Sequence, residues 1–334
     1  MPEGDTVWQT AKRLHTALAG KVLTRSDLRV PKYATADLTG RTVLDVTPRG
    51  KHLLTRIEGG LTLHSHLRMD GTWRVYANGR RWSGGGLAHQ IRVILGTADL
   101  TAVGYRLPVL ELLRTPEEDR AVGHLGPDLL GPDWNPELAL ANLLADPARP
   151  LGEALLDQRN LAGLGNIYKS ELCFLLGATP WLPVGTLPAD RAAKLPAIAK
   201  RLLEANRDRP IRNTTSTLTN NSPIPNRTTG PPTPAHPAPG TRTTPPGIPA
   251  HPAPRTRTST PGTTPLHPAT RPHTPDLFVY GRAPRPCLRC NTPLRTANQG
   301  DGSRDRPTYW CPTCQVGPAP GTTTPPKTQH RTTN

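Results

Sequence analysis

Four cysteines near the end of the chain have a spacing that suits a metal ion. Cys287-Leu-Arg-Cys290 and Cys311-Pro-Thr-Cys314 form two pairs with twenty residues between them, at the edge of the usual spacing of structural zinc sites. Four thiolates close a tetrahedral site and leave no open position, so we expect one structural zinc ion and no catalytic metal. Two disulfides are the alternative. Cys173 stands alone among apolar residues, and we expect it to be an inert core residue.

A glycine-rich turn in the middle of the chain suits the binding of an anion. In Gly163-Leu-Gly165-Asn166-Ile-Tyr168 a helix is predicted to begin at about Asn166. The backbone amides at a helix N-terminus attract anions, and the two glycines leave their approach open. The side chain of Asn166 can add a donor. A plain corner between two helices is an equally good interpretation of the spacing alone.

The first residues offer a nucleophile. Initiator methionine is normally removed before proline, which would leave Pro2 with a free secondary amine. The pKa of an α-amino group lies near 8, and the positive end of the following helix should lower it further. Attack of this amine on the anomeric carbon of a sugar gives an iminium ion, which drives elimination of the attached phosphate. Glu3 is placed to move protons. Many chains begin with Pro-Glu for no chemical reason.

Two basic residues are candidates for binding phosphate. Lys51 lies where a predicted turn leads into a strand, and its amine could hold a phosphate or assist proton transfer. Arg306, or its neighbour Arg304, lies near the tip of a predicted hairpin between the cysteine pairs and could bind a phosphate with two hydrogen bonds. A solvated lysine and a solvated turn are the alternatives.

The pattern of apolar residues predicts a β-rich first part. A helix is expected to run to Leu18, with Asp5 or Thr6 as its N-cap and Gly20 as its end. From about residue 21 to residue 113, β-like runs alternate with glycine turns, as at 43–46, 53–57, 61–67 and 91–95. We expect a β-sandwich or barrel with an N-terminal helix.

The second part of the chain is predicted to be helical and then of low complexity. Helices are expected at 136–144, 151–158, 167–176 and 189–205. The chain has 41 prolines, and the stretch that follows is rich in Pro, Thr and Arg, so we expect it to be disordered. The fold class is therefore α+β, with a β-sandwich domain (1–125), a helical domain (126–208), an insertion (209–276), a zinc hairpin (277–316) and a tail (317–334).

The charge of the chain favours a polyanionic partner. Its 334 residues have a net charge of +16, and the stretch 209–275, with seven arginines and no acidic residue, leaves +9 to the rest. Such a field attracts nucleic acid or an acidic membrane surface, and a soluble protein that happens to be basic is the alternative. No apolar run approaches the roughly 20 residues of a membrane span. The start of the chain also lacks the pattern of a signal peptide.

Six motifs, in this order, resemble the formamidopyrimidine-DNA glycosylase and endonuclease VIII family. They are Pro2-Glu-Gly4, Arg49-Gly-Lys-His-Leu-Leu54, Ser65-His-Leu-Arg-Met-Asp-Gly71, Leu125-Gly-Pro-Asp128, Gly163-Leu-Gly-Asn-Ile-Tyr168, and Val279-Tyr-Gly-Arg282 leading into the cysteines. The Pro-Glu-Gly start and Arg306-Pro-Thr-Tyr-Trp-Cys311 resemble the endonuclease VIII branch more than the other.

The resemblance implies a two-domain clamp on damaged double-stranded DNA, built from a β-sandwich, a helix–two-turn–helix unit and a zinc hairpin. It implies removal of oxidised bases followed by β,δ-elimination at the abasic site. We expect a monomer in the cytoplasm, associated with the nucleoid. By motif, Pro2 is the nucleophile, Glu3 the proton donor and Lys51 the lysine that contacts phosphate during elimination. The resemblance also implies three DNA-binding residues, namely the phosphate ligands Asn166 and Arg306, and Met69 as the wedge that fills the gap left by the extruded nucleotide.

Three departures from the family pattern stand out. Thr6 lies where relatives often have a second Glu, and Asp70 lies where the endonuclease VIII pattern often has an aromatic wedge. The insertion at 209–276 falls where relatives carry a loop over the damaged base, so the preferred lesion is left open.

Three classes of function fit parts of the sequence. An enzyme that combines glycosylase and lyase activities explains all six motifs. A DNA-binding protein without turnover would keep the clamp and the zinc hairpin. A tautomerase with an N-terminal proline explains Pro2 alone, and leaves the cysteines and the positive charge without a purpose.

Overall fold

The computed structural model describes residues 2–82, 84, 86–216, 276–300, 305–318 and 320. Residues 1–219 and 275–334 group into one compact unit. Most of the predicted insertion and tail, together with Arg304, lies outside the described residues, so the expected disorder there stays a prediction. None of the helices in the described ranges combines the length and apolarity that crossing a membrane requires.

The first helix, α1 (Gly4–Leu18), packs one apolar face into the N-terminal core. Val7, Ala11 and Leu14 are buried there, as their helical spacing predicts. The expected N-cap was wrong, because the helix begins at Gly4 and the cap position is Glu3. Asp5 lies inside the first turn of α1, where its carboxylate accepts from the amide of Thr6 and from the hydroxyl of Tyr168.

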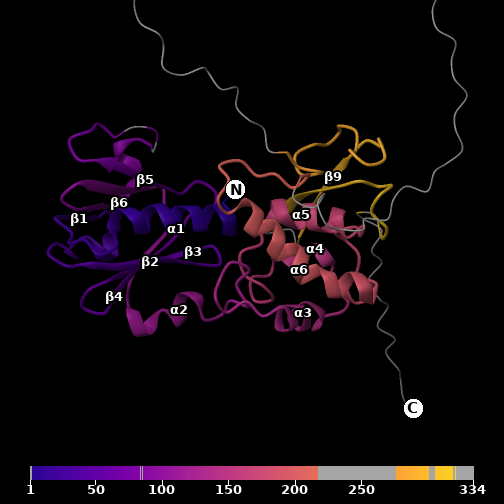
Figure 1. The fold of residues 1–334 in the computed structure, drawn as a ribbon, viewed down its shortest axis with the longest axis horizontal. Coiled ribbons are helices and arrows are strands. Elements are labelled where there is room, and N and C mark those ends of the chain that lie inside the picture. Colours follow the sequence, from indigo (N-terminus) through magenta and orange to yellow (C-terminus); the bar gives the residue numbers. More distant parts are fainter. Residues whose placement is uncertain are drawn as a thin grey trace, which may run out of the picture. The chain divides into compact units, whose positions relative to one another are not determined.

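Two four-stranded antiparallel sheets form the predicted sandwich among the described residues. One sheet has the order β1-β6-β7-β5 and the other β2-β3-β4-β8. In Figure 1, α1 lies between these sheets and its first turn points toward α5 and α6. The strands are β1 (Arg25–Leu28), β2 (Val43–Arg49), β3 (His52–Ile57), β4 (Leu61–His66), β5 (Thr72–Ala77), β6 (Ile91–Gly96), β7 (Leu100–Tyr105) and β8 (Val109–Arg114), with short 3-10 turns at Pro31–Tyr33, Ala88–Gln90 and Thr115–Glu117.

The helical part surrounds a second core of leucine and alanine side chains. Its elements are α2 (Asp119–Val122), α3 (Pro136–Leu144), α4 (Leu151–Leu156), α5 (Asn166–Leu175), a 3-10 turn (Val184–Thr186) and α6 (Ala189–Asn206). These match the expected helices closely, except that α4 ends two residues before the predicted Gln158. Asp157 leaves the helical conformation there, and its carboxylate binds Arg149 and Arg159.

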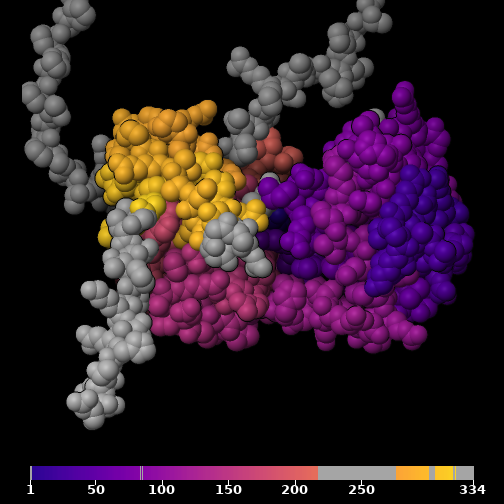
Figure 2. All heavy atoms as spheres, turned by 180° about the vertical axis from the view of Figure 1, so that it is seen from behind, coloured from indigo at the N-terminus to yellow at the C-terminus, as the bar shows by residue number. Residues whose placement is uncertain are grey.

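The C-terminal segment folds against α5. Strands β9 (Arg295–Gln299) and β10 (Arg306–Trp310) form the predicted antiparallel hairpin. Phe174 of α5 stacks on Phe278, and Trp181 meets Trp310 edge to face. Figure 2 shows the C-terminal residues, in orange and yellow, packed on the magenta surface of the helical residues. The predicted α+β class, with its sandwich, helices and four-cysteine hairpin, is confirmed.

Ordered chain continues past residue 208, where we placed the start of the insertion. Thr214 N–H donates to the carbonyl of Asp276 at 2.9 Å, and Asp276 N–H donates to that of Arg212 at 3.1 Å. The outgoing and returning chains are therefore joined at these residues. The proposed division into domains otherwise stays a prediction, with 209–216 better counted with the helical part.

Candidate active site

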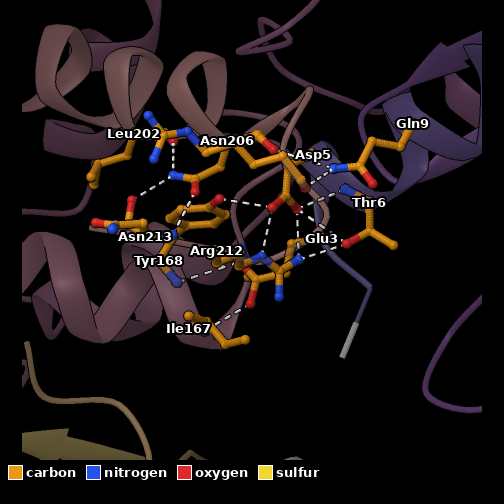
Figure 3. A network of polar contacts seen from close by, with 12 residues as sticks. Glu3, Asp5, Thr6, Gln9, Ile167, Tyr168, Leu202, Asn206, Arg212 and Asn213 are labelled. Carbon is orange, nitrogen blue, oxygen red and sulfur yellow. Dashed lines mark hydrogen bonds and ion pairs between the residues drawn. The ribbon is translucent and has the colours of Figure 1, made fainter. Parts of the chain in front are cut away.

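Glu3 holds the start of the chain on the N-terminus of α5. Its side chain is completely buried. One carboxylate oxygen accepts from Gly165 N–H at 2.9 Å and from Tyr168 N–H at 3.3 Å, and the other accepts from Ile167 N–H at 2.7 Å (Figure 3). A helix N-terminus carries a partial positive charge, so a carboxylate is stabilised there. The anion site that we predicted at this turn is thus filled by the protein's own Glu3, which corrects the expectation of an open site.

The glycines of this turn allow the close approach. A Cβ at Gly165 would lie 2.4 Å from Cδ of Glu3, closer than real Cβ atoms come, so the Glu3 side chain would have to move. Gly163 has φ +104, a conformation that favours glycine, and its carbonyl accepts from Gly4 N–H at 2.8 Å. The segment from Glu3 to Gly4 is therefore aligned along 163–168, and Pro2 directly precedes this segment. Met1 lies outside the described residues.

Lys51 reaches the same turn from the β-sandwich. Its Nζ donates to the carbonyl of Leu164 at 2.7 Å. Burial lowers the pKa of Lys51 to about 8; the negative charge of Glu3 opposes this shift, and the positive charges of Arg306 and Arg212 add to it. Glu3 and Lys51 are 48 residues apart in the sequence, and the fold brings both side chains to the turn at 163–168.

The turn that carries Lys51 is fixed by a buried carboxylate. Asp128 accepts from Gly50 N–H at 2.7 Å and from Leu130 N–H at 3.0 Å. Burial raises the pKa of Asp128, and these amide hydrogen bonds counter the shift. The motif Leu125-Gly-Pro-Asp128 had no predicted role, and the structure shows that its Asp128 positions the turn that carries Lys51.

Asn166 and Arg306 lie on either side of the contact between α5 and β10. Asn166 is only 2% exposed, and its Nδ2 donates to the carbonyl of Pro307 at 2.8 Å. Arg306 is exposed at the start of β10, directly before that proline. The side chain of Asn166 thus also serves to hold the hairpin, while Arg306 is available to solvent. Their roles as phosphate ligands stay predictions.

Met69 lies apart from these contacts, between β4 and β5, and is 53% exposed. The turn is linked to the lysine region through the sheet, because His66 at the end of β4 pairs with His52, the residue after Lys51. The role of Met69 as a wedge stays a prediction.

The four cysteines meet in one cluster. Their sulfur atoms all lie within 4.8 Å of one another. Sγ of Cys290 and Cys311 are 3.4 Å apart and those of Cys287 and Cys314 are 3.9 Å apart, too far for disulfides. A tetrahedral zinc ion with Zn–S bonds of about 2.3 Å places its sulfurs roughly 3.8 Å apart, so the cluster fits such an ion. The cluster is confirmed, and the identity of its metal is a proposal.

Comparison with known proteins establishes the family. Residues 1–106 match the family described as formamidopyrimidine-DNA glycosylase N-terminal domain. The chain is 68% identical over 320 residues to a protein of Streptomyces coelicolor named probable endonuclease 8 2, covering 96% of both chains. The chain belongs to the formamidopyrimidine-DNA glycosylase and endonuclease VIII family.

Other members of this family agree over the full length. A protein of Mycolicibacterium smegmatis named DNA-(apurinic or apyrimidinic site) lyase Nei2 is 42% identical, covering 95% of this chain and 99% of its own. A solved structure of Lactococcus lactis formamidopyrimidine-DNA glycosylase, bound to DNA with an abasic site, superimposes with a TM-score of 0.66 at 19% identity and covers 94% of this chain. That structural likeness shows the fold.

The structure adds residues that sequence reasoning missed. Lys169 on α5 is completely buried, and its Nζ donates to Oγ1 of Thr308 on β10 at 2.5 Å. Burial lowers the pKa of Lys169 to about 8. Asp5, which is buried, and Arg212, which is partly buried, form an ion pair near Glu3. The position of Lys169, directly after the Gly163–Tyr168 motif, was a signal that could have found it. Nothing in the local sequence distinguishes Arg212 from the neighbouring arginines.

Proposed function

We propose that this protein is a bifunctional DNA glycosylase and abasic-site lyase that uses the amine of Pro2 as its nucleophile. The observation that carries the proposal is the meeting of Glu3 and Lys51 at one glycine turn, with Pro2 directly before the anchored segment. Membership of the family supports the same activity.

The proposed reaction proceeds through a covalent intermediate. The neutral amine attacks C1′ of the damaged nucleotide, the C1′–N bond to the base breaks, and the base leaves with a proton. The C1′–O4′ bond then breaks, O4′ takes up a proton, and the opened sugar is held as an iminium ion. The resulting iminium ion makes the C2′ proton acidic, and loss of that proton expels the 3′ phosphate; a second elimination expels the 5′ phosphate. Water then hydrolyses the remaining iminium ion and frees the amine.

The side chains of this site have proposed parts in each step. Glu3 is fixed beside the amine by three amide hydrogen bonds, and we assign it the proton transfers. To Lys51, whose pKa burial lowers to about 8, we assign contact with the phosphate that leaves. Arg306 is exposed where a neighbouring phosphate could bind, Asn166 supports it through Pro307, and Met69 would fill the gap in the duplex.

Borohydride trapping on abasic duplex DNA tests the proposal. We expect a covalent adduct at Pro2 with the processed protein and none at Pro2 with a form that keeps Met1, because Met1 makes the nitrogen of Pro2 an amide nitrogen, which cannot form a reducible iminium ion. Glu3→Gln is the companion variant, and it should still bind abasic DNA while losing turnover. A protein that binds DNA tightly but never gives an adduct would support the rival interpretation, a damaged-DNA-binding protein without catalysis.

We further propose that the cysteine cluster holds one zinc ion of structural role. Metal analysis of the purified protein should find about one zinc per chain. Removal with a chelator should weaken DNA binding, because the metal supplies folding energy to a small hairpin that carries Arg306. Iron, or no metal at all, in active protein would overturn this assignment.

The expected partner and location are proposals of the same kind. Damaged double-stranded DNA is the expected partner of a monomer in the cytoplasm, near the nucleoid. A panel of duplexes with single defined lesions would establish which oxidised base is removed, and at what rate relative to cleavage at a bare abasic site.

A further inference from the structure

Asp5 is a second buried carboxylate in the anchored segment, and its partners come from the other half of the chain. Its oxygens accept from Nε and Nη2 of Arg212, both at 2.6 Å, and from the hydroxyl of Tyr168 at 2.8 Å (Figure 3). The same guanidinium donates to Oγ1 of Thr6 at 2.7 Å. Paired, nearly parallel hydrogen bonds between Arg and a carboxylate fix geometry as well as charge.

Arg212 lies at the junction where the chain leaves for the insertion and returns. Its own carbonyl accepts from Asp276 N–H, and the next residue, Asn213, bridges to Asp276. Its side chain lies over the ring of Tyr168, with 5.4 Å between the guanidinium carbon and the ring centroid. An arginine 207 residues from Asp5 in sequence is therefore built into the start of the chain.

The pair lies beside the groups that carry the proposed chemistry. Tyr168 joins the two anchors, because its amide binds Glu3 and its hydroxyl binds Asp5. The charge of Arg212 acts on Lys51, where it lowers the pKa, and the charges of Asp5 and Glu3 act on Arg212. Among the described residues, the charged and titratable groups that act on one another around the site include Glu3, Asp5, Lys51, Tyr168, Lys169, Arg212, Tyr280 and Arg306.

We propose that Arg212 is a positioning residue of the active site. Through Asp5 it fixes the segment that carries Pro2, and its positive charge disfavours protonation of the amines nearby. This inference rests on the proposed function, since it takes the nitrogen of Pro2 as the reacting atom. Arg212 acts through its neighbours and needs no contact with DNA.

Four variants separate the anchoring from the charge. Arg212→Met and Asp5→Asn each remove one charge, the double variant restores the net charge of the pair, and Arg212→Lys keeps the charge without the two-point geometry. Arg209→Met is the matched control, because the side chain of Arg209 is exposed three residues earlier, and its carbonyl accepts the hydrogen bond from Gln9 of α1.

The main readout is the pH dependence of single-turnover borohydride trapping. Loss of the positive charge in Arg212→Met stabilises the ammonium form, so the midpoint should move up by about one pH unit and the rate below it should fall about tenfold. Asp5→Asn should move the midpoint down. The double variant should keep the wild-type midpoint with a reduced rate, and Arg212→Lys should do the same. Arg209→Met should match wild type.

A second readout does not depend on activity. Hydrogen exchange at the amides of Gly165, Ile167 and Tyr168 reports whether Glu3 stays in place. We expect faster exchange in Arg212→Met and in the double variant, and unchanged exchange in Arg209→Met. Unchanged exchange together with an unchanged midpoint in Arg212→Met would overturn the inference. A wild-type protein that gives no adduct, but whose exchange responds to Arg212→Met, would instead refute the proposed function and leave the anchoring established.

Discussion

At the scale of single residues, the site depends on a carboxylate buried against a helix end. Glu3 has no compensating cation within hydrogen-bond distance among the described residues, and three backbone amides stabilise it instead. Because the amides need an unobstructed approach, the identity of Gly165 matters as much as that of Glu3.

Gly165→Ala tests this dependence. Its backbone, with φ −124, accepts alanine without strain, so the cost arises from the clash with Glu3 alone. We expect trapping to fall by about a hundredfold or more, in keeping with the loss of a precisely positioned group. Gly281→Ala strains the backbone at φ +70 but meets open space, so it is the control for a replaced glycine that leaves Glu3 untouched. Wild-type trapping by Gly165→Ala would show that Glu3 need not stay where the structure has it.

The lowered pKa of Lys51 predicts that the rate of elimination falls at alkaline pH. Its pKa of about 8 means that the charged form needed to contact phosphate is lost as pH rises through 8. The elimination step, measured after the imine has formed, should therefore slow between about pH 7.5 and 9.5. Lys51→Arg remains charged throughout this range and should flatten the profile. An identical alkaline fall in that variant would assign the limit to another group.

At the scale of elements, a cluster of histidine side chains lies across the antiparallel strands β3 and β4. Nδ1 of His52 lies 2.8 Å from Nε2 of His64, whose other ring nitrogen lies 3.0 Å from Glu111. The ring of His52 also meets those of His66 and His124. Burial is the main cause that lowers the pKa of His52 to about 3 and that of His66 to about 4, with neighbouring charges adding to it.

These shifts predict acid sensitivity of the sandwich. Both folded pKa values lie below the unfolded value of about 6.5, so the unfolded chain binds more protons between pH 6.5 and 4. Stability is then complete above about pH 6.5 and falls by about 1.4 kcal/mol per pH unit for each histidine as pH drops. Melting temperatures from pH 7.5 to 4.5 should show this slope. His52→Asn should reduce it, and an unaltered slope in that variant would exclude His52 as its source.

At the scale of the whole molecule, the junction of the insertion is closed by hydrogen bonds between residues 212–214 and Asp276. The chain between Ser216 and Asp276 contributes five arginines and no acidic residue. A short linker can replace residues 217–275 without moving Arg212, because the two ends already lie together.

Deletion of 217–275 should separate binding from chemistry. If these arginines only add non-specific attraction, the plot of log binding constant against log salt should become shallower, by roughly 0.9 in slope for each phosphate that they neutralise in the intact protein. The single-turnover rate at saturating protein should stay the same. A collapse of base excision at low salt would show instead that the insertion shapes the pocket for the base.

The sequence alone determined the elements and the chemistry of their parts. The alternating and helical spacing of apolar residues located the strands and helices, because an element that buries one face carries apolar residues at the period of that face. Cysteine spacing predicted the cluster because the cysteines of two close pairs can all reach one metal ion. The N-cap was misplaced at Asp5 or Thr6, because local capping preferences favour both residues over Glu3.

Only the tertiary structure decided which partners these groups take. Local patterns predicted an open anion site at Gly163–Asn166, whereas folding places Glu3 there, and Arg212 was counted among the arginines of a disordered stretch. Both outcomes depend on contacts between residues more than 160 positions apart. Such pairing is set by the burial of a charge together with the groups that stabilise it. The residues next to Glu3 and Arg212 in the sequence do not indicate which partners these two side chains take.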